Sequence, residues 1–135
     1  MKVSQMTVSV VEQMKDNEFH ARMNYFQSVA SVKGYRTQWS IYEADDIEQR
    51  ILENKTYQVR YQYVRNDATV EELNYDLQNG TQSSMAEVTS LAVDGTVEEL
   101  WRAAESCVKQ SGTHHTFIED FEIQEDGTLL LVTGS

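Results

Sequence analysis

The chain has 135 residues, a formal net charge of −11 and an apolar fraction of 40%. This length is typical of a single domain that can bury its own core, and 7 tyrosines, 4 phenylalanines and 2 tryptophans argue against disorder. The single cysteine, Cys107, excludes an internal disulfide. The first residues lack the apolar core of a signal peptide, and no apolar run approaches the roughly 20 residues that span a bilayer. We therefore expect a cytoplasmic protein with no membrane contact.

Hydrophobic periodicity predicts the elements of the first half in chain order. A strand is expected over 5–11, followed by a helix from Asp16 or Asn17 to about Ser31. Alternation then predicts a strand over 35–43, with apolar positions facing one side. A short helix is expected over 46–52. The next strand, over 56–65, places its tyrosines on one face and its polar residues on the other.

The pentapeptide TVEEL occurs twice, at 69–73 and 96–100, and each copy has the pattern of a helix capping box. The first copy predicts a helix to Asn79-Gly80, with an inward stripe of Val70, Leu73 and Leu77. The second predicts a helix to about Gln110, with an inward stripe of Val97, Leu100, Trp101, Ala104 and Val108. Similarity between the copies ends outside the cap, which favours convergent capping over a decayed duplication. Neither interpretation implies a catalytic or ligand-binding site.

A strand over 85–93 separates these helices, and a hairpin over 115–123 and 128–133 closes the chain around Asp126-Gly127, a strong turn signal. Helices alternate with strands, but the hairpin requires antiparallel pairing. The predicted fold is a single α+β domain over residues 1–135. It has a mixed or mostly antiparallel sheet of about five to six strands, with helices packed on it. The run 129–132 is either a central strand or the seam of an oligomer.

Charge is distributed unevenly along the chain. Residues 1–66 carry nine basic and eight acidic side chains, whereas residues 67–135 carry two basic and fourteen acidic ones, a net charge of −12. Such a half repels nucleic acid and anionic membranes and attracts basic partners. The carboxylates predicted to contact a basic partner protein are those of the terminal hairpin together with one helical residue: Glu98, Glu119, Asp120, Glu122, Glu125 and Asp126.

Residues with reactive or metal-binding side chains are few. His114 and His115 with Glu119 and Asp120 form the one His-carboxylate cluster, to which His20 could add a ligand, but closed zinc sites usually take four ligands at tighter spacing. Cys107 falls beside an apolar stripe, which favours a structural role over a nucleophilic one. The tyrosines and Arg60 of the strand over 56–65 lie on opposite faces, unlike a nucleic-acid platform. We predict neither metal, cofactor nor direct nucleic-acid contact.

The sequence is therefore interpreted as a non-catalytic acidic interaction protein that binds a basic partner, with a nucleic-acid mimic as a sharper variant. A structural subunit of a homo-oligomeric assembly, including a viral one, is the alternative. A small enzyme or metal protein that uses His114 and His115 is the third class. We expect self-association in the first two cases.

Overall fold

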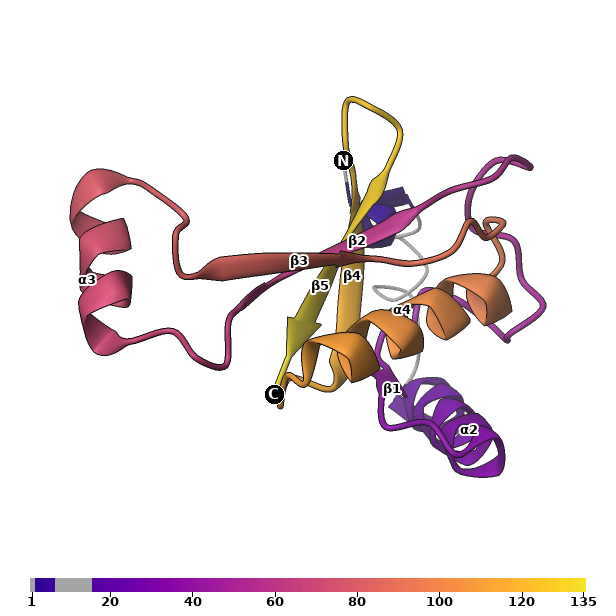
Figure 1. Cartoon of the computed structure of the whole chain (residues 1–135). Coiled ribbons are helices and arrows are strands. Elements are labelled where there is room, and N and C mark those ends of the chain that lie inside the picture. The colour runs from indigo at the N-terminus through magenta and orange to yellow at the C-terminus, as the bar shows by residue number, and fades with distance from the viewer. Residues whose placement is uncertain (1, 7–15) are drawn as a thin grey trace.

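The structure is a computed structural model that describes residues 2–6 and 16–135. Its elements are η1 (Val3–Met6), α2 (Asp16–Lys33), β1 (Gln38–Trp39), β2 (Val59–Val64), α3 (Val70–Asn79), β3 (Met85–Thr89), α4 (Val97–Ser111), β4 (Phe117–Ile123) and β5 (Leu129–Gly134). Figure 1 shows one sheet with α4 and α2 beside it, while α3 stands far from both. The predicted α+β fold with a mixed sheet and a C-terminal hairpin is confirmed.

The sheet has the strand order β1-β4-β5-β2-β3. The β4–β5 and β2–β3 pairs are antiparallel, whereas β1 runs parallel to β4 and β2 runs parallel to β5. Gly127 supplies the positive φ, 85°, that the β4–β5 turn requires. Leu129 and Leu131 of β5 are buried, so the apolar run 129–132 is a central strand.

The core lies where α4 and α2 pack against the sheet. The predicted stripe of α4 is confirmed, because all five of its members are fully buried: Val97, Leu100, Trp101, Ala104 and Val108. Phe26 of α2 and Trp39 of β1 meet Trp101, with ring centroids 6.1 and 5.9 Å away, respectively. Edge and tilted contacts at these distances are typical of aromatic cores.

One buried carboxylate joins α4 to the segment that leads into β1. Glu105 is 3% exposed and accepts hydrogen bonds from the Thr37 backbone N–H at 2.9 Å and from the Thr37 hydroxyl at 2.8 Å. The indole N–H of Trp101 donates to the same Thr37 hydroxyl oxygen at 2.9 Å. The network is satisfied on every member, which is the condition for burying polar groups without a large penalty.

Of the predictions for the N-terminal part of the chain, the helix is confirmed and the two strands are confirmed only in part or not at all. Residues 7–11 of the strand expected over 5–11 lie outside the described residues, and positions 5 and 6 belong to the end of η1. The helix from position 16 is confirmed and continues to Lys33. In the predicted strand over 35–43 only Gln38 and Trp39 pair with a neighbour, although the alternation of buried and less buried residues holds.

The helix expected over 46–52 is wrong, since this segment holds no helical residue and consists of turns, bends and an isolated bridge between Arg50 and Thr96. Its carbonyl groups are used elsewhere: Val97 N–H donates to Gln49 O at 3.0 Å, and Glu98 N–H donates to Ile47 O at 2.8 Å. These N–H groups open α4 and have no partner within the helix. The segment therefore supplies acceptors to α4 instead of forming a helix of its own.

The strands around the first TVEEL copy are close to expectation. In β2, Val59 and Tyr61 are buried on one face while Gln62 is exposed on the other, as predicted. In the strand expected over 85–93, β3 ends at Thr89, where the Ser90 hydroxyl replaces a backbone acceptor for Val59 N–H at 3.1 Å, but Val93 still pairs with Tyr57 in an isolated bridge. Among residues 2–6 and 16–135, no helix has the length and apolar composition needed to cross a bilayer.

Candidate functional site

The helix α3 and its two connections, residues 65–85, project from the body of the protein; we call this segment the α3 arm. Thr69 caps the helix by accepting the Glu72 N–H at 3.1 Å, and Gly80 ends it in the left-handed region with φ 63°. The predicted helix and its Thr cap are thus confirmed, whereas the Glu72 carboxylate of the predicted capping box accepts the Thr69 hydroxyl at 3.4 Å and pairs with Arg65. Figure 1 shows α3 beyond the end of the extended β2–β3 ribbon, away from the other helices.

The apolar stripe of α3 does not face the core, so the predicted inward packing of Val70, Leu73 and Leu77 is wrong. Within the described chain no α3 residue is buried; Val70 is 72% exposed and Leu77 is 84% exposed. The stripe instead lines an open groove of about 530 Å³, whose far wall includes Met85 at the start of β3. The loops before and after α3 place the helix beyond the end of the sheet, where it does not contact the surface against which α4 packs (Figure 1).

The charges of the α3 arm are organised around two residues. Arg65 pairs with Asp67 at 2.6 Å and with Glu72. Asp76 accepts hydrogen bonds from the hydroxyls of Thr81, Ser83 and Ser84, and these bonds, that of Ser84 foremost, hold the pKa of its carboxyl well below its usual range. The carboxylate therefore stays ionised and ties α3 to the returning loop. With four carboxylates and one cation, the arm has a net charge of −3.

The carboxylates predicted to contact a partner occupy different environments. Asp120 is 6% exposed and accepts the Ser4 N–H at 3.0 Å, so it anchors η1 to β4 instead of facing solvent. Asp126 accepts the Thr128 hydroxyl at 2.7 Å within the hairpin turn. Glu119 and Glu125 are exposed, whereas Glu122 is half-buried.

Cations of the first half neutralise carboxylates of the second half. Ion pairs of 2.8 to 3.5 Å join the two halves of the sequence: Lys33–Glu98, Arg50–Asp94 and Arg60–Glu87. Arg65 adds its two partners on the arm. The two halves of the sequence therefore meet in ion pairs, and the first half neutralises part of the negative charge of the second. A nucleic-acid mimic needs a row of unpaired carboxylates, so these pairs lend no support to that variant.

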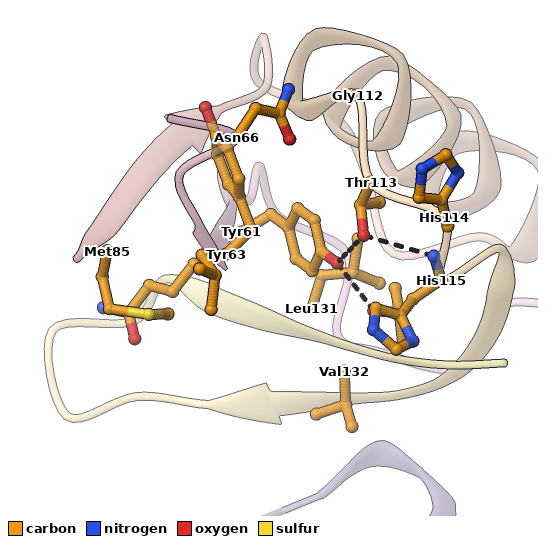
Figure 2. A pocket seen from close by; sticks show the side chains of 13 residues that line it. Tyr61, Tyr63, Asn66, Met85, Gly112, Thr113, His114, His115, Leu131 and Val132 are labelled. Carbon is orange, nitrogen blue, oxygen red and sulfur yellow. Dashed lines mark hydrogen bonds between the residues drawn. The ribbon is translucent and has the colours of Figure 1, made fainter. Parts of the chain in front are cut away.

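A second concave site, of about 500 Å³, lies between β2, β5 and the loop 112–115 that follows α4 (Figure 2). Tyr61 crosses it, with its hydroxyl 2.8 Å from the Thr133 hydroxyl and 3.5 Å from the Thr113 hydroxyl. His114 and His115 lie at one end, and Met85 lies at the other (Figure 2). Among the described residues that line this pocket there is no Asp, Glu, Lys or Arg.

The predicted His-carboxylate cluster does not assemble into a metal site in the described part of the chain, where no three His, Cys, Asp or Glu side chains converge closely enough to hold an ion. His114 and His115 are exposed, while Asp120 is buried and already bonded. Cys107 is fully buried, and burial raises the pKa of its thiol to about 11. That environment suppresses the thiolate and agrees with a structural cysteine.

Comparison of the chain with protein-family models, curated proteins and solved structures found no match.

Proposed function

We propose that the protein is a non-catalytic interaction protein that docks a basic partner protein through its α3 arm. The observation that carries this proposal is the exposed apolar stripe on a folded, capped helix. An isolated helix of ten residues is marginal in water, and most helical stability in proteins comes from burying an apolar face. Packing of Val70 and Leu77 into a partner would gain roughly 1.5–3 kcal/mol for each side chain buried completely.

The arm also indicates the chemistry of its partner. Its groove carries an apolar stripe of Val70, Leu73, Leu77 and Met85 beside the carboxylate of Asp76, and the arm has a net charge of −3. A segment with apolar side chains flanked by Lys or Arg complements both features, because opposite charges speed the encounter while the apolar contact supplies affinity. A second copy of the same arm would bring −3 against −3, which favours a different protein as the occupant. The arm lies within the acidic half that the sequence indicated.

The test uses a defined probe, a fluorescent 14-residue amphipathic helix with Leu on one face and Lys on the other. Anisotropy titrations compare the wild type with Leu77→Asp, which puts a charge in the groove. Leu91→Asp is the matched control, because Leu91 is 88% exposed but lies outside the arm. We expect at least a tenfold loss of affinity for Leu77→Asp alone, weaker binding by the wild type in high salt, and thermal midpoints equal to that of the wild type.

Three results would contradict the proposal. Equal losses for Leu77→Asp and Leu91→Asp would show that the peptide binds the acidic surface without selecting the groove. Loss of binding in the double variant Glu119→Gln/Glu125→Gln, with Leu77→Asp unaffected, would move the docking surface to the hairpin. Sedimentation that shows a dimer dissolved by Leu77→Asp would instead make a second copy the occupant, as the homo-oligomer alternative requires.

A further inference from the structure

Strands β2 and β5 are neighbours that separate soon after they meet. They pair in parallel only at Val59–Leu129 and Arg60–Leu130. Beyond these pairs, as far as the described residues go, positions 61–64 of β2 pair with β3 alone, and positions 131–134 of β5 pair with β4 alone. The charge-free pocket of Figure 2 lies between the two separated edges. We call it the β2–β5 notch.

The backbone groups that face the notch follow from strand alternation. Leu129 N–H donates to Gln58 O at 2.9 Å, so these two residues point toward the opposite strand. Because successive residues of a strand point their N–H and C=O groups to opposite sides, Gln62 and Val64 face the notch from β2, and Thr133 faces it from β5. Each edge therefore presents donors and acceptors at the spacing of a strand.

We infer that the β2–β5 notch binds an extended peptide segment of another protein, which adds a strand between β2 and β5. An extended backbone has alternating donors and acceptors that match both edges together, which is the basis of strand-addition recognition. Entry of the strand breaks the contact between the Tyr61 and Thr133 hydroxyls, which lie 2.8 Å apart across the notch. Because β2 and β5 are parallel, one added strand has the same orientation relative to both. About four residues fill the length of the separated edges, at roughly 3.3 Å per residue.

The lining predicts a neutral segment. In a chain of net charge −11, the pocket walls carry no acidic or basic side chain apart from the two histidines at one end. A charged side chain would therefore lose hydration there without gaining a partner. The apolar side chains of the lining, which include Tyr63, Met85 and Leu131, suit β-branched and other apolar residues, while Gln62 and Asn66 offer uncharged polar contacts. This occupant differs from the basic partner of the α3 arm, so the inference stands independently of the proposed function.

The probe is a display library of random octapeptides, selected on the full chain and counter-selected on Thr133→Pro. Proline removes one N–H that faces the notch, while the bonds from β5 to β4 come from the residues on either side of Thr133. Thr133→Val measures the effect of losing the hydroxyl that contacts Tyr61. Val64→Pro removes a backbone donor from the opposite edge. It provides the same test if Thr133→Pro does not fold. The enriched peptide is then synthesised with and without methyl groups on alternate backbone nitrogens.

We expect the unmethylated peptide to shift the amide resonances of Gln62, Val64 and Thr133. The proline variants should bind it at least tenfold more weakly than Thr133→Val, and the methylated peptide should not bind. Failure of the library to enrich on the wild type over Thr133→Pro would overturn the inference. Equal binding of the methylated peptide would also overturn it, because the notch would then recognise side chains or small apolar ligands. A dimer that Thr133→Pro dissolves would assign the notch to a second copy of this chain.

Discussion

The two TVEEL caps allow one local motif to be measured in two tertiary settings. Thr96→Ala removes the acceptor of the Glu99 N–H, 3.3 Å away, and Thr69→Ala removes the acceptor of the Glu72 N–H, 3.1 Å away. Loss of a Thr cap costs about 1 kcal/mol of helix stability. Helix α4 buries nine residues, so its unfolding is global unfolding, whereas α3 buries none. We expect Thr96→Ala to lower the free energy of unfolding by about 1 kcal/mol and the thermal midpoint by about 4 °C.

For Thr69→Ala we expect no change in the free energy of the core transition in urea, because α3 opens on its own and is already unfolded when the core unfolds. Urea titrations followed by the fluorescence of the buried Trp39 and Trp101 measure the global value for both variants. Hydrogen exchange of the α3 amides measures local opening, which should increase in Thr69→Ala alone. Equal global losses for the two variants would show instead that α3 belongs to the cooperative core.

Further predictions concern three ionisable side chains. Glu105→Ala should lower the free energy of unfolding in urea by about 3 kcal/mol, because it leaves buried donors of Thr37 without an acceptor; an effect under 1 kcal/mol would contradict the buried network. Burial raises the pKa of Cys107 to about 11, so stability should decline as pH rises from about 8.5, where the unfolded thiol ionises, towards 11. Unfolding titrations of Cys107→Ala should lack that part of the decline. The pKa of Asp76 is lowered by the hydroxyls around it, so its contribution to the α3 arm is present above the unfolded pKa of about 4 and lost as pH falls below it. The protection factors of the arm amides, which correct exchange for its intrinsic pH dependence, should then fall with acid in the wild type but not in Asp76→Asn.

Local chemistry accounts for the elements that the sequence predicted well. Capping residues, glycine stops and the period of apolar side chains act within a few residues of each other, so both TVEEL helices and the Asp126-Gly127 hairpin were predictable. The stripe of α4 and the tyrosine face of β2 were assigned to the core correctly for the same reason. The burial of Cys107 followed from its place beside that stripe.

Which apolar faces are covered and which charges are paired depends on contacts between distant parts of the chain. Val70 and Leu77 have the same spacing as core residues, and periodicity cannot tell whether a sheet lies opposite them. The segment 46–52 is not helical, and its carbonyl groups accept hydrogen bonds from the first N–H groups of α4.

The sequence predicted Asp120 to be a surface carboxylate. In the fold it accepts a hydrogen bond from the backbone N–H of Ser4, which is distant in the sequence. The notch between β2 and β5 arises where two strands far apart in the chain meet and then separate. In each case the sequence sets which apolar, charged and backbone groups a segment presents. The fold sets which of them are buried or paired, because burial and pairing depend on neighbours that come from elsewhere in the chain.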